Sequence, residues 1–119
     1  MPKFEVEFYE KQDGEQPAKD FLLSLDTKMR AKIVNMIAIL ADNGNDLREP
    51  YSKHLSEGIF EIRTKLGSNI TRVLYFFYID KHIILTNGFI KKAQKTPLGE
   101  IDKAKKYRAD YLQRKESKK

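Results

Sequence analysis

Two arginines interrupt segments of the chain that are otherwise largely apolar. Arg63 ends the stretch FEIR, and Arg72 lies within ITRVLYFF. An arginine in a buried strand is costly unless it is paired or needed for function. A guanidinium stays charged at any accessible pH, and its planar fork of N–H groups binds a phosphate through two parallel hydrogen bonds. The two arginines are therefore candidate groups for binding a phosphate.

A carboxylate accompanies the arginines and allows a second interpretation. Glu61 lies two residues before Arg63, so both side chains point to the same face of an extended strand. A salt bridge from Glu61 to Arg63 or to Arg72 would make the arginines structural. In a phosphate site, the same carboxylate is a candidate general base. The residues leave both roles of Glu61 open.

Lysines supply further positive charge beyond both ends of this region. Lys91, Lys92 and Lys95 belong to GFIKKAQKTP, which follows an apolar segment, and Lys53 precedes FEIR in the chain. A one-sided basic surface favours a polyanionic partner such as nucleic acid. Tyr75, in the segment RVLYFF, offers a ring or hydroxyl for contact with a nucleobase. We expect Lys53, Lys95 and Tyr75 to bind RNA or phosphate around the arginines.

The hydrophobic pattern predicts the elements that would position these groups. Period-two alternation and β-branched content predict strands over residues 3–10, 59–65, 70–79 and 82–90, and helical spacing predicts helices over residues 18–25, 27–44 and 98–115. Pro17 suits the first turn of the first helix, and Asp26 is a candidate N-cap of the second. The segment 45–58, which contains Pro50, is predicted to be a loop.

These elements define an α+β fold in the order β-α-α-β-β-β-α. Short turns make the last three strands antiparallel neighbours. The first strand can join them, which gives a four-stranded, largely antiparallel sheet with the helical pair on one face and a C-terminal helix. The turn LGSN would bring Arg63 and Arg72 to the same end of this sheet. A chain of 119 residues forms a single domain over residues 1–119.

Composition narrows the class of protein. The chain has no cysteine, so neither a disulfide framework nor a thiolate zinc site is available. No run approaches the roughly 18 apolar residues of a membrane span, and the N-terminus has no signal-peptide stretch. We therefore expect a cytoplasmic protein that does not enter a membrane. The net charge is +6, and from Lys53 onward basic residues outnumber acidic ones.

Most familiar catalytic motifs are absent from the sequence. It has no GxxxxGKS/T loop, no GxGxxG and no HExxH, and its two histidines, His54 and His82, lie far apart without a cysteine partner. Metal-dependent hydrolysis and acyl transfer therefore fit poorly. The basic face of the C-terminal helix has two interpretations, a contact for RNA and an ordinary solvated face.

The stretch 52–111 resembles the phage-derived, HigB-type branch of the RelE toxin superfamily. The shared pattern is KxL-x-x-G-[ILF]-[WF]-E-[IL]-R, then R-[VI]-L-Y-F, then G-F-x-K-K-x-x-K-T-P-x-x-E-I, and every part of it is present. With the N-terminal β-α-α unit, the resemblance covers nearly the whole chain. It is the combination that is specific, since no single part would suffice.

The resemblance implies a ribosome-dependent endonuclease that cleaves mRNA and needs neither a metal nor another cofactor. The ribose 2′-OH attacks the adjacent phosphate and leaves a cyclic phosphate and a free 5′-OH. Arg72 matches the phosphate-binding arginine of the family, Arg63 a basic strand position, and Lys91 and Lys92 a basic pair after the last strand. The C-terminus lacks the histidine–tyrosine pair that some relatives use, so Glu61 or a lysine of lowered pKa is left for proton transfer.

The resemblance also implies partners. A helix-turn-helix antitoxin would hold the toxin inactive in a toxin–antitoxin hetero-oligomer, and operator DNA would be bound only through that complex. One alternative is a non-catalytic module that acts only in such an autoregulatory complex. Another is a basic surface that serves protein interaction alone.

Overall fold

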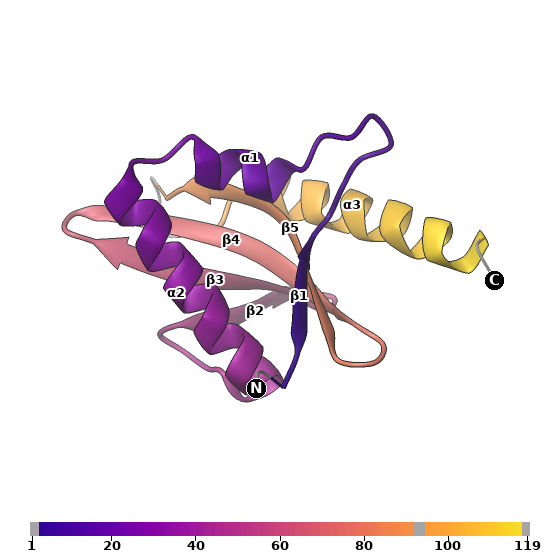
Figure 1. Cartoon of the computed structure of the whole chain (residues 1–119), viewed down its shortest axis with the longest axis horizontal. Coiled ribbons are helices and arrows are strands. Elements are labelled where there is room, and N and C mark those ends of the chain that lie inside the picture. The colour runs from indigo at the N-terminus through magenta and orange to yellow at the C-terminus, as the bar shows by residue number, and fades with distance from the viewer. Residues whose placement is uncertain (1–2, 92–94, 118–119) are drawn as a thin grey trace.

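The computed structural model describes residues 3–91 and 95–117. Within this part of the chain, five strands, three α-helices and a short 3₁₀ helix follow one another (Figure 1). In chain order they are β1 (Glu5–Phe8), α1 (Pro17–Leu23), α2 (Thr27–Asn43), η1 (Gly44–Asp46), β2 (Ser52–Ser56), β3 (Ile59–Leu66), β4 (Asn69–Tyr78), β5 (His82–Ile90) and α3 (Leu98–Ser117).

The strands form one mixed sheet in the order β1-β5-β4-β3-β2. β1 pairs in parallel with β5, and the other neighbours are antiparallel. The α+β class and the antiparallel order of β3, β4 and β5 agree with the sequence-based prediction. The prediction of four strands was wrong, because the sheet has five.

The additional strand, β2, lies in the segment that was predicted to be a loop. It begins two residues after Pro50 and pairs with β3 at the edge of the sheet. Lys53 and His54 are exposed on it, whereas Ser52 is buried. Because an edge strand tolerates polar residues and a nearby proline, its sequence lacks the apolar alternation of an internal strand.

Helices cover both faces of the sheet (Figure 1). α1 and α2 pack on one face and α3 packs on the other. β4 is central, and its side chains alternate between the two cores: Val73 and Tyr75 face α1 and α2, whereas Leu74 and Phe76 face α3. β4 is therefore buried on both faces.

The ends of the helices follow the predicted signals. The Asp26 carboxylate accepts a hydrogen bond of 2.8 Å from the Met29 backbone N–H and caps α2, and Pro17 is the first residue of α1. Satisfying a free N–H in this way typically stabilises a helix by about 1 kcal/mol. On α3, Ile101 and Tyr111 are buried.

Gly88 fixes how closely α1 approaches the sheet. A Cβ atom at this position would lie 2.4 Å from Cδ2 of the Phe21 ring, so a larger residue would force this ring to move. The next residue, Phe89, packs in the core beneath α3. The GF pair of GFIKKAQKTP thus places one residue against each helical layer and fixes the end of β5, where the lysines begin.

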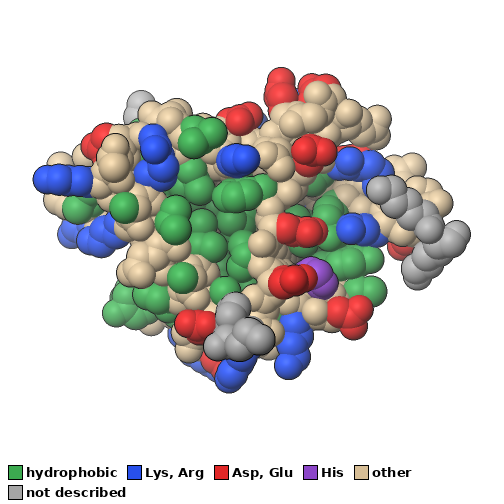
Figure 2. All heavy atoms as spheres, viewed as in Figure 1, with side chains coloured by type: hydrophobic (Ala, Val, Ile, Leu, Met, Phe, Trp, Pro, Cys, Tyr) green, Lys and Arg blue, Asp and Glu red, His purple; other side chains and the backbone are tan. Residues whose placement is uncertain are grey.

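Surface properties differ across the molecule. Figure 2 shows apolar side chains gathered over the middle of the face that carries α1, α2 and β1, with acidic side chains beside them. None of the helices in the described ranges is both long enough and apolar enough to cross a membrane.

Candidate functional site

The β3–β4 hairpin places the two arginines directly opposite each other. Arg63 pairs with Arg72 in the register of the two strands. The backbone N–H of Arg63 donates to the Tyr51 carbonyl on the other side of β3, so the two arginines form a non-hydrogen-bonded pair. In such a pair the Cα atoms approach to about 4.5 Å and the side chains lie close together. The prediction that both guanidiniums meet at one end of the sheet is confirmed.

Both side chains leave the sheet on the face that α3 covers. Arg72 has the same strand parity as Leu74 and Phe76, which pack under α3. Arg72 is nearly inaccessible, with 4% of its side chain exposed, whereas 27% of the Arg63 side chain remains exposed. The site therefore has a buried inner cation and a partly solvated outer one.

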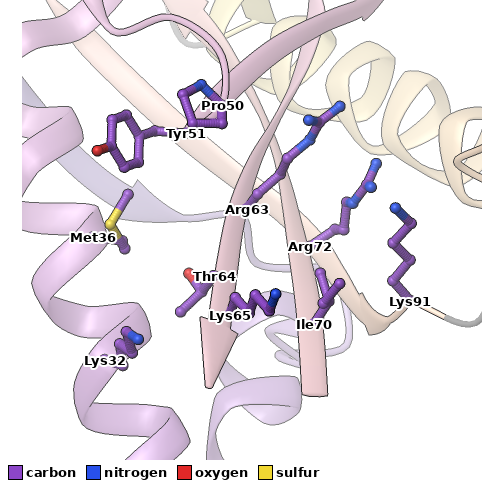
Figure 3. Close-up of a pocket in the computed structure, with 10 residues that line it drawn as sticks. All are labelled: Lys32, Met36, Pro50, Tyr51, Arg63, Thr64, Lys65, Ile70, Arg72 and Lys91. Carbon is purple, nitrogen blue, oxygen red and sulfur yellow. The ribbon is translucent and has the colours of Figure 1, made fainter. Parts of the chain in front are cut away.

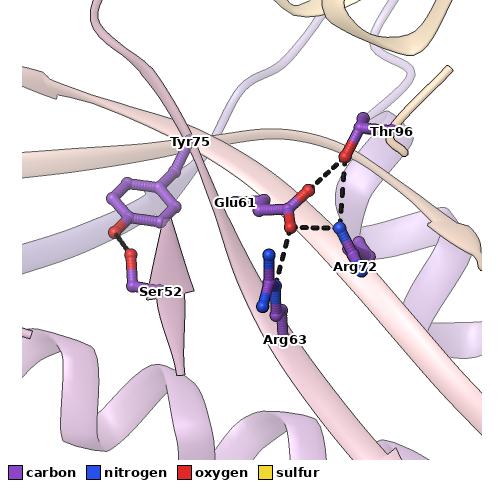
Figure 4. A network of polar contacts seen from close by, with 6 residues as sticks. All are labelled: Ser52, Glu61, Arg63, Arg72, Tyr75 and Thr96. Atoms are coloured by element: carbon purple, nitrogen blue, oxygen red, sulfur yellow. Dashed lines mark hydrogen bonds and ion pairs between the residues drawn. The ribbon is translucent and has the colours of Figure 1, made fainter. Parts of the chain in front are cut away.

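A single buried carboxylate joins the two arginines (Figure 4). Oε2 of Glu61 accepts a hydrogen bond of 2.9 Å from Nε of Arg63 and a second one from Nη1 of Arg72. The Glu61 side chain is fully buried. The structural interpretation of Glu61, as the salt-bridge partner of these arginines, is thus confirmed with both of them.

Thr96 completes the network from a segment far away in the sequence. Its hydroxyl donates to Oε1 of Glu61 and accepts a hydrogen bond of 3.3 Å from Nη1 of Arg72 (Figure 4). Sequence reasoning missed this residue. The available signal was its place in KTP, directly before Pro97, whose fixed backbone opens α3 and holds the preceding residues in an extended conformation.

The cluster retains donors for an anion. Two guanidiniums share one carboxylate, which leaves a net positive charge. Among the residues that the structure describes, no acceptor is found for the buried Nε of Arg72. A buried donor without a partner is costly to the fold. Arg63, with 27% of its side chain exposed, is a cation of the cluster that an anion can reach from solvent.

Electrostatics at the site reflect burial and crowding of cations. Burial lowers the pKa of Arg72, and the Glu61 carboxylate partly offsets this effect. Even so, an arginine keeps its charge at neutral pH. The pKa of Lys91 is also lowered from 10.5, first by loss of solvation and then by the nearby charges of Arg72, Arg63 and Lys53. Lys91 therefore belongs to the cluster.

A hollow with a volume of about 390 Å³ opens beside the arginine pair (Figure 3). Volumes of this size are typical of small-ligand pockets. No acidic side chain is among the described residues that line it. Its basic lining residues are Lys32, Arg63, Lys65, Arg72 and Lys91.

The remaining predicted residues are placed less favourably. Lys53 lies opposite Glu61 in the register of β2 and β3, so it shares the face of the cluster, and its side chain is exposed. Lys95 is exposed next to Thr96. Lys92 lies outside the described residues.

The expected role of Tyr75 in RNA stacking does not fit the structure. Tyr75 is 1% exposed, faces α1 and α2, and its hydroxyl is hydrogen-bonded to Ser52 (Figure 4). Its ring packs against Phe60 and Phe77. No face of the ring is open to a nucleobase, so Tyr75 is a core residue.

Several basic residues of α3 make contacts within the protein. Lys105 forms a 3.1 Å ion pair with Glu57, and Arg114 forms a 2.8 Å ion pair with Asp110. Asp110 also accepts a hydrogen bond from Tyr9, whose pKa rises to about 12 through burial and this bond. These contacts occupy Lys105 and Arg114 within the protein.

Comparison with known proteins places this architecture in a family. The family model described as Phage derived protein Gp49-like (DUF891) matches residues 20–109. This range contains Glu61, Arg63, Arg72 and Thr96, and most of the sheet that positions them. A search of the curated proteins found no match. The chain therefore belongs to the Gp49-like family, a phage-derived, toxin-like family within the RelE/ParE superfamily.

Proposed function

We propose that the protein is the HigB-type toxin of a type II toxin–antitoxin system and cleaves mRNA on the ribosome without a metal. The observation that supports this proposal best is the convergence of Arg63, Arg72 and Lys91 from three segments around one buried carboxylate. Such a cluster suits a phosphodiester, which is an anion with two non-bridging oxygens that accept hydrogen bonds.

The proposed reaction requires stabilisation of charge at phosphorus. The 2′-OH of the ribose gives its proton to solvent as its oxygen attacks the adjacent phosphorus, the bond from phosphorus to the 5′ oxygen breaks, and a 2′,3′-cyclic phosphate and a 5′-OH remain. Negative charge accumulates on the non-bridging oxygens in the transition state. Arg72 and Arg63 are positioned to donate to those oxygens from rigid strands, so little reorganisation accompanies the reaction.

The surroundings of Glu61 and Lys91 suggest different roles for them. The Glu61 carboxylate is fully buried and already accepts hydrogen bonds from Arg63, Arg72 and Thr96, which suits a residue that positions the guanidiniums. Lys91 lies at the end of β5 with a lowered pKa. An ammonium that gives up its proton more readily suits a general acid that protonates the 5′ leaving oxygen.

Growth and RNA ends test the proposed function together. Induction of the wild-type protein should arrest growth and produce mRNA fragments with 5′-OH and 2′,3′-cyclic phosphate ends. Arg63→Ala should weaken both effects because it removes one donor. Lys106→Ala, which changes an exposed residue of α3, should leave both intact. Normal growth despite confirmed synthesis of the wild-type protein would refute the proposal.

The role of Lys91 predicts a particular pH dependence. Because the pKa of Lys91 is lowered from 10.5, the protonated form is lost at a lower pH than in a free lysine as the pH rises. We therefore expect the cleavage rate to fall on the alkaline side. Lys91→Arg keeps the charge but cannot donate a proton readily, and should lower cleavage on the order of 10²–10⁴-fold while RNA affinity is kept. Single-turnover rates over a pH series measure this; a fully active Lys91→Arg variant would make Lys91 a fixed cation only.

An antitoxin partner belongs to the same proposal. Leu23 on α1 is 58% exposed and Val34 on α2 is 52% exposed, which provides apolar surface away from the arginine cluster. Co-expression with a helix-turn-helix antitoxin should restore growth, and operator DNA should be bound by the complex and not by the toxin alone. Growth effects that do not respond to substitution of the arginines would instead favour the non-catalytic binding module.

A further inference from the structure

The hollow beside the arginines has an apolar end that the phosphate site does not use. Tyr51, Pro50 and Met36 line it, and Figure 3 shows Tyr51 and Met36 on one side of β3, with Arg63, Arg72 and Lys91 on the other. One hollow thus combines an aromatic ring with a group of cations.

Tyr51 is placed differently from the other tyrosines. All six lie within the described residues. Tyr51 is 53% exposed, whereas the other five are buried or partly buried. Its carbonyl accepts the backbone N–H of Arg63 at 2.8 Å, which ties the position of Tyr51 to the strand that carries this arginine. The backbone of Tyr51 is thus fixed beside β3, and its exposed ring is available for stacking.

We propose that Tyr51 is a nucleobase-stacking residue and that the hollow holds one nucleotide of single-stranded RNA. The phosphate lies toward Arg63 and Arg72, and the base lies against the ring of Tyr51. This inference rests on the proposed function and adds to it the residue that contacts the base.

Three properties of the hollow match this occupant. Its volume of about 390 Å³ is that of a small-ligand site. Its charged lining residues are all basic, as an anionic backbone requires. Proteins recognise unpaired bases chiefly by stacking them on aromatic rings, while cations hold the backbone.

The absence of tryptophan from the chain makes the proposal directly measurable. Tyr51→Trp introduces a single fluorophore at the hollow. Ile79→Trp is the matched control, since Ile79 is 63% exposed and follows β4 at the end remote from Arg72. The probe is a 2′-O-methyl oligoribonucleotide, which lacks the attacking hydroxyl, and its counterpart is an abasic oligomer of equal length.

We expect the oligonucleotide to quench Tyr51→Trp, the abasic oligomer to leave it nearly unchanged, and Ile79→Trp to respond to neither. By anisotropy at fixed salt, Tyr51→Leu should lower the affinity for the base-bearing oligomer by roughly 5- to 150-fold, the range for loss of one stacked base. Tyr51→Leu should leave the affinity for the abasic oligomer unchanged. Tyr51→Phe keeps the ring and should bind like the wild type.

Other outcomes would overturn the proposal. Equal quenching by the abasic oligomer would mean that the hollow binds the charged backbone and makes no contact with a base. If neither oligomer binds but an acidic peptide does, the hollow is a site for a protein partner. If Tyr51→Leu binds and cleaves RNA like the wild type, stacking is refuted while the nuclease function stands. If the wild type neither binds the oligonucleotide nor cleaves mRNA on the ribosome, both are refuted.

Discussion

Replacing Glu61 by glutamine is expected to destabilise the native state by about 3–5 kcal/mol, because it leaves buried cations without their counter-charge. Glu61 is fully buried, and the Arg72 side chain beside it is only 4% exposed. The amide keeps the shape of the carboxylate, so the loss isolates charge from packing. Compared with a typical total stability of roughly 5–15 kcal/mol, this is a large effect. Urea unfolding, read as a shift of the midpoint at constant slope, measures it.

Two further variants distinguish charge from other causes. Glu57→Gln removes an exposed carboxylate that pairs with Lys105, and should change stability by about 1 kcal/mol or less. The double variant Glu61→Leu, Arg72→Met replaces the buried pair by apolar groups. Such replacements are often neutral or stabilising, so this protein should regain stability yet lose function. A single Glu61→Gln variant as stable as the wild type would show that Glu61 is not the counter-ion that its contacts indicate.

Replacing Arg72 by alanine is expected to lower the rate of RNA cleavage on the order of 10²–10³-fold, the usual cost of removing one donor to developing charge. Arg72 is the inner cation, and the nearby Glu61 retains Arg63 and Thr96 as partners when it is lost. The effect on folding should therefore be smaller than that of Glu61→Gln. Growth arrest should be relieved in proportion to the loss of cleavage.

Arg72→Lys provides the conservative comparison. Lysine keeps the charge but cannot present two parallel donors, so cleavage should fall while much of the RNA affinity is kept. Cleavage rates and RNA affinities of both variants, together with their urea midpoints, separate chemistry from binding and folding. An Arg72→Ala protein that still arrests growth as the wild type does would remove Arg72 from the site.

The sequence predicted the arginine pair well because a hairpin has few degrees of freedom. Once the turn over LGSN is recognised, antiparallel pairing forces Arg63 and Arg72 to adjacent positions. The error at Tyr75 could have been avoided. Residues 72 and 75 are an odd number apart in one strand, so their side chains leave the sheet on opposite faces. Because β4 has apolar residues on both faces, its composition alone does not show that Arg72 and Tyr75 lie on different faces.

Other features depended on tertiary structure. β2 is an edge strand whose polar residues mask its pattern, and its pairing is visible only from β3. Thr96 reaches Glu61 because the chain returns to the sheet after β5, which no local periodicity encodes. Tyr51 was passed over because its segment was predicted to be a loop. Local pattern thus predicted the strands that carry the cations, and tertiary packing determined their neighbours.

The two opposed guanidiniums repel each other, and the carboxylate that they share offsets this repulsion during folding. Like charges so close together would separate in a flexible loop and would have to be drawn together by each arriving substrate. Here the internal counter-ion draws them together as the chain folds. On the proposed function, an incoming phosphodiester would find the two cations already assembled, without a closing segment to bring them together.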